Sequence, residues 1–455
     1  MEREQISKKR AKEIFRQFGN HISEGQIKYL SAGHLDMLEG DRLDTKFFDA
    51  TTGKTYFDGF SSAGSFNTGR RNSRIVDALC ESLHEYDMGT PILLSRSKIE
   101  FARKLVDLAP GDLNKVIFTG SGADSIEAAI KLARGATGRE EIISMINAYH
   151  GHSGFSLSAG GKDYYKELFQ PLMPDFCLVP FGDLTTIKQL ASPKTAAILI
   201  EPIQGEGGIN VGSNEYLQGL RTLCDDLGIV LIFDEIQTGF GRTGRTWFSE
   251  YSEVIPDVMT LAKSIGGGVY PNGAIVYRDT PDLTNFVNDY PFFHMSSGGG
   301  SNIGCRISAE VIDELSEKQL AKNAEKMGTR LQNELSEIML QHPESIHEVR
   351  GKGLMIGIEY KHEFMGMIMA DSLSKSGVFA AYSGNAPQVM RLMLPLTITE
   401  NDVDEFLTKF RKAMKILGYY LVVLLPLTKI TIFRKWVNDP NNLIPISSFL
   451  RRFGF

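Results

Sequence analysis

The chain has 455 residues, of which 42% are hydrophobic and 23% are charged, and its formal net charge is −6. This length is enough for two or three domains, and the composition is that of an ordinary globular protein. The net negative charge gives no electrostatic reason to expect a nucleic acid partner, so we expect none.

Near the start, residues 5–30 mix charged and hydrophobic side chains at helical spacing, and residues 47–57 predict a hairpin. From about residue 72, strand patterns alternate with helical patterns such as 125–134. This alternation predicts a mainly parallel sheet covered by helices on both faces. The seven predicted strands are 115–119, 141–146, 176–180, 195–200, 228–234, 258–261 and 273–277.

After residue 300 the pattern changes to that of a smaller α+β domain. Residues 308–340 predict a long helical region, and residues 401–417 predict a final helix. Between them lie predicted strands at 353–360, 377–382 and 389–394. We therefore expect an N-terminal segment (1–71) that joins the small domain, a large domain (72–305), the small domain (306–417) and an extension (418–455). The extension could be a terminal helix packed on its own protein, a partner-docking tail or a membrane-surface patch.

The cysteines and the apolar stretches bear on the compartment. Cys80, Cys177, Cys224 and Cys305 are widely spaced, which is typical of reduced thiols and not of a disulfide framework or a metal site. The charged start of the chain lacks the apolar core of a secretory signal. The longest apolar stretch, residues 416–427, is shorter than the ~20 residues that span a bilayer. We expect a cytoplasmic protein without a transmembrane segment.

The most informative residue is Lys263, which is followed by three glycines at 266–268. Asp234 ends the apolar run 229–233, which reads as a strand buried on both faces. A carboxylate at that end of a parallel strand points into the crevice where such sheets bind ligands. A desolvated lysine and a buried acid fit pyridoxal phosphate, since the lysine forms a Schiff base and the acid keeps the pyridine nitrogen protonated. Gln237, one turn on, can reach the ring hydroxyl.

Four further motifs allow both a functional and a structural interpretation. Residues 120–123, between a strand and a helix, could bind an anion through backbone N–H groups or merely cap the helix. Tyr149 could stack on a cofactor ring or belong to the core. Glu201 and Glu206 lie at the end of another apolar strand, which favours a site over structural ion pairs. Arg391, within an apolar strand, needs either a ligand or a fixed salt bridge.

Together these motifs resemble the class III aminotransferases of pyridoxal phosphate fold type I, the group of the acetylornithine, ornithine and 4-aminobutyrate aminotransferases. The specific strings are residues 201–206 and 234–244 with the spacing to Lys263, and the resemblance covers roughly residues 30–415. It implies a large cofactor-binding domain with a mainly parallel seven-stranded sheet, and a smaller α+β domain. It also implies a ping-pong transfer of an amino group from an amine donor to a 2-oxo acid.

The resemblance also implies roles for individual residues. Lys263 matches the Schiff-base lysine, Asp234 the partner of the ring nitrogen and Gln237 the partner of the ring oxygen. The expected remaining cofactor-binding residues are Ser121, Gly122 and Ala123 at the phosphate, Tyr149 as the stacking aromatic, the adjacent His150, and Ser297.

The expected substrate-binding residues are Arg391, Glu206, Ser296 and His152. Arg391 resembles the arginine that holds a substrate carboxylate, and Glu206 the acid that pairs with it and frees it. Ser296 and Ser297 match a pair whose second member reaches the phosphate of the neighbouring subunit. The resemblance therefore implies a homodimer with its active sites at the interface.

Some residues depart from the family pattern. Members that act on acetylornithine or ornithine carry an arginine where this chain has His152, which suggests a donor without a distal carboxylate, or one carried on a larger molecule. Residues 69–72 and 298–302 also differ from the usual motifs. Residues 149–152 are similar to those of glutamate-1-semialdehyde aminomutase. An aminomutase or epimerase is therefore the alternative function, and a non-catalytic binding protein on this fold is a remote one.

Overall fold

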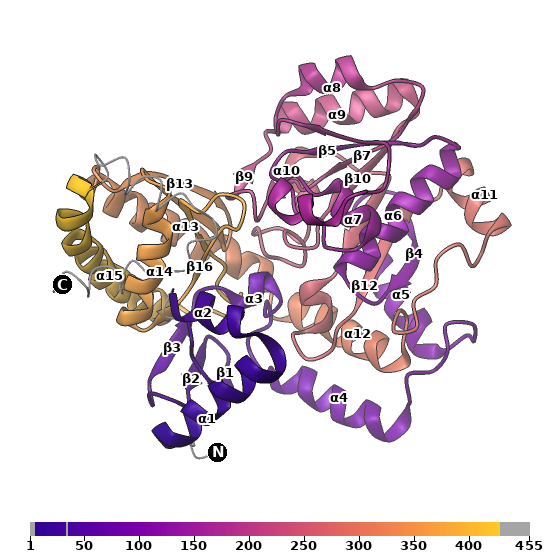
Figure 1. Ribbon diagram of the computed structural model, residues 1–455. Coiled ribbons are helices and arrows are strands. Elements are labelled where there is room, and N and C mark those ends of the chain that lie inside the picture. The colour runs from indigo at the N-terminus through magenta and orange to yellow at the C-terminus, as the bar shows by residue number, and fades with distance from the viewer. Residues whose placement is uncertain (1–4, 33–34, 428–455) are drawn as a thin grey trace.

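The computed structural model describes residues 5–32 and 35–427, and a seven-stranded sheet lies at its centre (Figure 1). In order across the sheet, the strands are β4 (Leu113–Thr119), β12 (Gly273–Arg278), β11 (Val258–Leu261), β10 (Val230–Asp234), β7 (Thr195–Ile200), β5 (Glu141–Met145) and β6 (Phe176–Val179). β12 runs antiparallel to β4 and β11, and every other adjacent pair is parallel. The predicted fold class is confirmed.

Helices cover both faces of this sheet, as expected for strands that are apolar throughout. One face packs against α6 (Gly122–Thr137), α7 (Gly154–Ala159) and α11 (Pro281–Asp289). The other packs against α4 (Ser73–Glu85), α5 (Arg96–Leu108), α8 (Leu184–Leu190), α9 (Asn214–Leu227), α10 (Ser249–Ser252) and α12 (Asn302–Glu317). In β7, Ile198 and Ile200 join one core while Leu199 joins the opposite one, which is the two-residue repeat of a strand.

A second, antiparallel sheet lies in the C-terminal part of the chain. Its strands, in order, are β13 (Ile346–Lys352), β14 (Met355–Tyr360), β17 (Val389–Leu392) and β16 (Ala381–Tyr382). The helices beside it are α13 (Leu320–Gln341), α14 (Phe364–Ser376) and α15 (Glu400–Leu427). The prediction of one strand at 353–360 missed β13, which pairs with β14 across a turn at Gly353, where φ is +52°.

The N-terminal segment packs against this C-terminal part. It contains α1 (Lys8–Phe18), the π-helical η1 (Gly19–Ser23), α2 (Glu24–Ala32), β1 (Glu39–Leu43), β2 (Lys46–Asp49), β3 (Thr55–Asp58) and α3 (Ser61–Gly64). β2 and β3 form the predicted hairpin. β3 also pairs in parallel with β15 (Val378–Phe379), so the predicted strand 377–382 is divided between two sheets. The division of the chain at residues 71, 305 and 417 stays a prediction.

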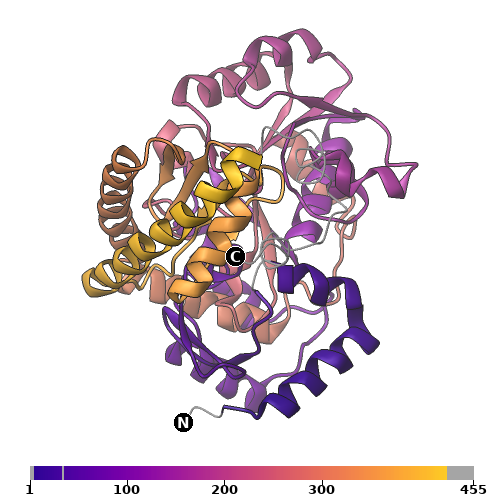
Figure 2. The same cartoon turned by 60° about the vertical axis from the view of Figure 1, so that its left-hand side comes forward.

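Two helices differ from the predicted ones. The long helical region expected at 308–340 consists of α12 and α13, which are separated at Gln319, where φ is +52°. The break lets the chain leave the large sheet and cross to the smaller one. α15 passes residue 417, the predicted helix end, and lies across the outside of the C-terminal part (Figure 2). There Leu421 is buried and the Tyr420 hydroxyl donates to Asp371 Oδ2 at 2.9 Å.

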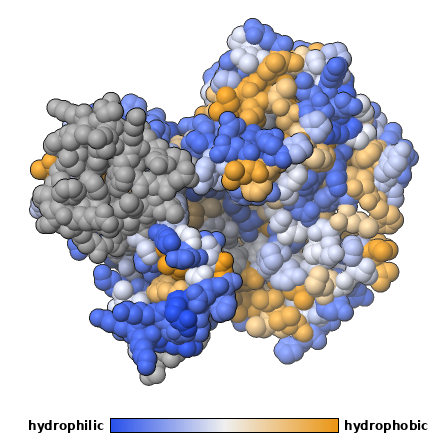
Figure 3. All heavy atoms as spheres, in the orientation of Figure 1, coloured by the Kyte–Doolittle hydropathy of each residue, from blue (hydrophilic) through white to orange (hydrophobic). Residues whose placement is uncertain are grey.

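The first residues of the expected extension therefore pack on their own chain, while residues 428–455 lie outside the described part. Within residues 5–32 and 35–427, none of the helices has both the length and the apolar character that crossing a membrane requires. On the surface, hydrophilic residues surround the N-terminal helices, which are blue at the lower left of Figure 3, and α1 is rich in lysine and arginine.

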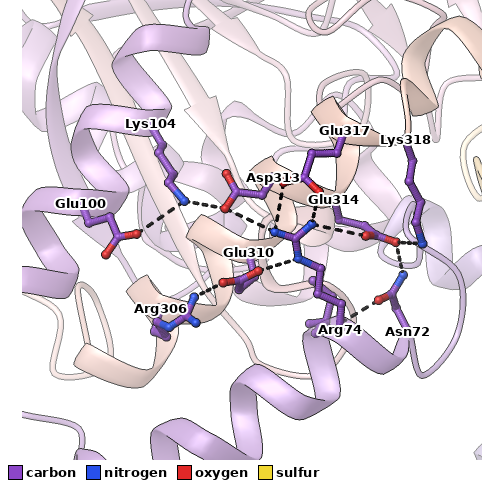
Figure 4. A network of polar contacts seen from close by, with 11 residues as sticks. Asn72, Arg74, Glu100, Lys104, Arg306, Glu310, Asp313, Glu314, Glu317 and Lys318 are labelled. Atoms are coloured by element: carbon purple, nitrogen blue, oxygen red, sulfur yellow. Dashed lines mark hydrogen bonds and ion pairs between the residues drawn. The ribbon is translucent and has the colours of Figure 1, made fainter.

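A charged network joins α4, α5 and α12 on one side of the large sheet (Figure 4). Arg74 on α4 contacts Glu310 at 2.7 Å and Glu317 at 2.7 Å, both on α12. Lys104 on α5 contacts Asp313 of the same helix at 2.6 Å. Exposed pairs of this kind contribute little singly, but a network fixes how neighbouring helices lie. Here it holds α4 and α12 together, and both helices contact the loop that carries Lys263.

The helical glycines provide a test of this packing. A Cβ at position 328 on α13 would lie 2.1 Å from the carbonyl oxygen of Gly353, whereas a Cβ at position 418 on α15 would meet nothing within 4 Å. We expect Gly328→Ala to lower the free energy of unfolding by about 1–3 kcal/mol, because the helix must move away from the turn. Gly418→Ala, the matched control, should leave it unchanged or raise it by up to about 1 kcal/mol. Thermal unfolding measures both, and equal midpoints would contradict this packing.

Candidate active site

Most of the predicted site residues line one cavity of about 690 Å³ at the carboxyl ends of the parallel strands. Ligands bind at this edge in open α/β sheets. The predicted residues in its wall are Ser121, Gly122, Ala123, Tyr149, His150, His152, Glu206, Asp234, Gln237 and Lys263. They come from five separate segments of the chain, and four of these segments meet because each follows a strand of the large sheet.

Lys263 follows β11 and begins the short 3-10 helix η4 (Lys263–Gly266). Its φ is +50°, a conformation that non-glycine residues rarely adopt and that is found mostly at functional sites. Burial lowers the pKa of the Lys263 amine, and the nearby carboxylates of Asp234, Glu206 and Glu201 oppose this shift. The side chain is deep in the protein but keeps partial access to the cavity. A lysine held in this way has a larger neutral, nucleophilic fraction than a surface lysine.

The glycines after Lys263 make room for neighbouring helices. A Cβ on Gly267 would lie 2.7 Å from Ile75 of α4 and 3.0 Å from Val311 of α12, and a Cβ on Gly268 would lie 2.2 Å from Phe66. Both glycines also have positive φ, at +59° and +71°. The two helices joined by the charged network, α4 and α12, therefore pack directly against the loop that carries Lys263.

Asp234 ends β10 on the floor of the cavity and pairs with His150. Its Oδ2 lies 2.7 Å from His150 Nδ1, and its Oδ1 accepts from the Ile236 N–H at 3.1 Å and the Thr260 hydroxyl at 3.3 Å. The carboxylate is 4% exposed, so these contacts offset the cost of burying its charge. These contacts fix the orientation of the Asp234 carboxylate, and one of them comes from His150. The sequence placed His150 only beside the cofactor.

The buried polar atoms of the cavity-lining residues that have no hydrogen-bond partner within the described ranges include His150 Nε2 and Gln237 Oε1. The other end of the Gln237 amide donates to the Ala63 carbonyl at 3.2 Å. A Cβ on Gly205 would lie 1.7 Å from Gln237 Oε1, so a side chain at position 205 would displace this amide. Unpaired buried polar groups are costly, which is typical of a site that a polar ligand completes. These residues fit a polar heteroaromatic cofactor.

The turn between β4 and α6 has the geometry that suits an anion. Ser121 caps the 16-residue helix α6 by accepting from the Asp124 N–H at 3.3 Å. The Gly122 and Ala123 backbones follow at the helix N-terminus, where N–H groups and the helix dipole favour negative charge. Ser296 lies against Gly120 of this turn, and Ser297 is exposed. Neither serine lines the cavity of its own chain, so the structure does not bring this predicted pair into the site.

Arg391 on β17 pairs with Glu206, as the sequence allowed. Arg391 Nη1 lies 2.6 Å from Glu206 Oε1, and this contact is an ion pair without the geometry of a hydrogen bond. The guanidinium carbon lies over the Phe60 ring, 5.2 Å from its centroid. The Gly384 N–H donates to Glu206 Oε2 at 2.9 Å. Arg391 is 3% exposed, so removal of Glu206 from this pair would leave a buried charge open to another carboxylate.

Aromatic rings form the wall beside this pair. His152 meets the rings of Tyr149 and Tyr165 edge to face, with centroids 5.3 Å and 5.2 Å apart. Burial, followed by the charge of Glu206, raises the pKa of Tyr165 to about 12, so the phenol keeps its proton at neutral pH. Tyr165 was not predicted. It lies on η2 (Asp163–Tyr165), a loop element away from the strand ends, where the sequence offered no signal.

The sequence places Glu201 at a strand end without indicating a role for it. Its carboxylate accepts from the Tyr149 N–H at 3.0 Å and the Gly205 N–H at 3.2 Å. Burial raises the pKa of Glu201 to about 7, and the nearby His150 opposes that shift. Glu201 therefore fixes the loop that carries Tyr149 and the glycine beside Gln237. Its position after an apolar strand, like that of Asp234, was the available signal.

Comparison with known proteins identifies the family. The sequence profile of the class III aminotransferases matches residues 36–414. An uncharacterized aminotransferase from Archaeoglobus fulgidus is 37% identical over 404 residues, which is 89% of this chain and 94% of that protein.

Solved structures agree. The ornithine aminotransferase of Toxoplasma gondii, which carries pyridoxal phosphate at its active site, superposes with a TM-score of 0.82 at 26% identity, over 90% of this chain and 94% of that one. An (S)-enantioselective omega-transaminase from Thermomicrobium roseum gives a TM-score of 0.81 at 27% identity, over 90% and 99%. With a cavity wall that suits the cofactor, this chain belongs to the class III aminotransferases and is a pyridoxal phosphate-dependent enzyme that transfers amino groups.

Proposed function

We propose that the enzyme carries out two successive half-reactions in this cavity, releasing the carbonyl product of an amine donor before a 2-oxo acid takes up the amino group. The observation that carries the proposal is the buried lysine with a lowered pKa that shares one cavity with the Asp234–His150 pair. Because the lysine is nucleophilic and the carboxylate is fixed, both functions that the cofactor requires lie within the same wall.

When bound, the cofactor supplies a covalent link to the amine and a ring that takes up the electrons left when a proton leaves the adjacent carbon. Lys263 would hold the cofactor, then accept that proton and return it at the cofactor's aldehyde carbon. Asp234, oriented by His150, would keep a proton on the ring nitrogen, and Gln237 Oε1 would accept from the ring hydroxyl.

The rest of the cofactor would be held by the walls of the cavity. The backbone N–H groups at Gly122 and Ala123, with the Ser121 hydroxyl, would hold the phosphate at the start of α6. Tyr149 would stack on the ring, kept in place by Glu201. In the second half-reaction Arg391 would bind a carboxylate of the oxo acid after Glu206 turns away from it.

The proposal extends to the donor and to the assembly. The rings around His152 and the charge of Glu206 favour an amine without a distal carboxylate, or one carried on a larger molecule. Ser297 would reach the phosphate of a neighbouring subunit in a homodimer. Exposed apolar side chains on α4, α5 and the loop between them suit such an interface, at the lower right of Figure 3. They are Leu83, Ile92, Leu93, Leu94 and Ile99. The cytoplasmic location stays a prediction.

Replacement of the lysine tests its role directly. In Lys263→Ala we expect the visible absorbance of bound cofactor to be lost and turnover to fall by at least about 10⁴-fold, because the nucleophile and the proton carrier disappear together. Mass spectrometry after borohydride reduction should find the cofactor on Lys263 in the wild type and on no lysine in the variant. Lys188→Ala, at an exposed lysine on α8, should behave as the wild type. Retained turnover in Lys263→Ala would show that the assignment is wrong.

The stoichiometry of the reaction separates a transaminase from its alternative. Without an oxo acid, we expect one equivalent of donor to be consumed per active site, because the amino group stays on the enzyme until an acceptor removes it. Addition of 2-oxoglutarate or pyruvate should restart the reaction. Continued conversion of the donor without an acceptor would instead identify an aminomutase or an epimerase.

The donor preference depends on His152. We expect amines without a distal carboxylate to have values of kcat/KM at least about tenfold above those of ornithine and acetylornithine, since a second carboxylate would meet aromatic rings and Glu206. A panel of amines with pyruvate or 2-oxoglutarate, followed by the cofactor spectrum, measures this. His152→Arg should narrow the difference. A wild type that prefers ornithine would contradict this part of the proposal.

A further inference from the structure

Arg350 connects the C-terminal sheet to the loop that carries Glu206. It lies on β13, and its guanidinium donates to the Gly208 carbonyl at 2.6 Å from Nη2 and 3.0 Å from Nε, and to the Ile209 carbonyl at 3.2 Å. The loop joins the two short strands β8 (Ile203–Gln204) and β9 (Asn210–Val211), and β9 lies beside β13 (Figure 1). One side chain therefore fixes two consecutive carbonyls of this loop from another sheet.

The loop is strained and tightly packed. Ile209 has φ of +57°, which is unusual for a β-branched residue and persists only where the surroundings enforce it. Gly208 has φ of +108°, and a Cβ there would lie 3.0 Å from Ala386 and 3.2 Å from Val389. A Cβ on Gly357 of β14 would lie 2.9 Å from Ile209 Cβ. The loop thus sits against the C-terminal sheet in one arrangement.

This arrangement determines where the Glu206 carboxylate lies. The Asn385 N–H donates to the Glu206 carbonyl at 3.0 Å, and the Gly384 N–H donates to the carboxylate at 2.9 Å. Both backbone and side chain of Glu206 are therefore held next to Arg391. Since Arg350 fixes the residues that follow, the backbone cannot withdraw when the carboxylate leaves Arg391.

We propose that Arg350 is a positioning residue for Glu206: it keeps the loop backbone fixed, so that the Glu206 carboxylate is exchanged on Arg391 by side-chain rotation alone. The inference rests on the proposed function, in which Glu206 and the oxo acid compete for Arg391. Arg350 sets that competition by determining how often the Glu206 carboxylate is in reach of the guanidinium.

A purely structural role is the alternative, because Arg350 also contacts Glu348 at 2.7 Å and Glu359 within the β13–β14 pair. Those contacts use Nη1, whereas Nε and Nη2 are directed to the loop carbonyls. The planar fork of an arginine suits this division, and a lysine ammonium does not. Arg350→Lys therefore keeps the charge beside both carboxylates but cannot hold both carbonyls in the same way.

The test measures the two half-reactions of the holoenzyme separately, with single-turnover kinetics on the cofactor spectrum. For Glu206→Gln we expect the oxo acid to bind more tightly and the neutral donor to react more slowly, since nothing competes for Arg391 and its charge is unpaired in the first half-reaction. Arg350→Gln should likewise tighten the binding of the oxo acid and slow the reaction of the neutral donor. We expect each change to be about 2-fold to 30-fold, as for a residue that acts through its contacts. Arg350→Lys should give a smaller shift of the same kind.

Lys352→Gln, at an exposed lysine of the same strand, is the matched control and should change neither half-reaction. In the double variant Arg350→Gln/Glu206→Gln the shift should not exceed that of Glu206→Gln, because both act on one contact. If Arg350→Gln and Arg350→Lys slow both half-reactions equally, or if the double variant is additive, the positioning role is wrong while the proposed function stands. If Glu206→Gln itself shifts neither half-reaction, the competition at Arg391 is wrong, and the inference fails with it.

Discussion

The structure depends on keeping several charges buried in and beside one cavity without leaving any of them unbalanced. Asp234 is held by His150, and Arg391 is held by Glu206. Lys263 lies among three carboxylates that oppose the lowering of its pKa by burial. Burial of an isolated charge costs far more than the net stability of a domain allows, so each group needs the others. The charged groups in and beside the cavity therefore balance one another. The two sheets bring these groups together.

Close packing supplies the precision that electrostatics alone cannot. Gly205 admits the Gln237 amide, and Gly267 admits Ile75 and Val311. In both places a methyl group would displace a functional segment, which explains why the glycine-rich strings coincide with the site. The charged network around Arg74 acts at longer range on the same loop, because it fixes the helices that contact Gly267.

Much of the fold and of the site could be predicted from the sequence, for a physical reason. Strands buried on both faces are continuous apolar runs, so their ends are visible, and a residue such as Asp234 that follows such a run must lie at the ligand-binding edge. The family resemblance supplied the role of Glu206, which spacing alone did not.

The features that the sequence did not reveal depend on contacts between distant segments. Tyr165 contacts the ring of His152 from a loop with no strand pattern, and the two sets of contacts of Arg350 exist only because β13 lies beside β9. The break at Gln319 reflects the passage from one sheet to the other and not a helix-breaking residue. The predicted serine pair at 296–297 lies outside the cavity of its own chain.

The antiparallel strand β12 has a consequence for the reactive amine. A parallel neighbour of β11 would require a crossover helix that carries the chain to the opposite edge of the sheet. Because β12 runs back, the chain after Lys263 both leaves and re-enters the sheet at the catalytic edge. This return loop has little regular structure of its own, so α4 and α12 stabilise it by packing against it. Ile75 and Val311, which lie outside the cavity wall, therefore support the loop that carries Lys263.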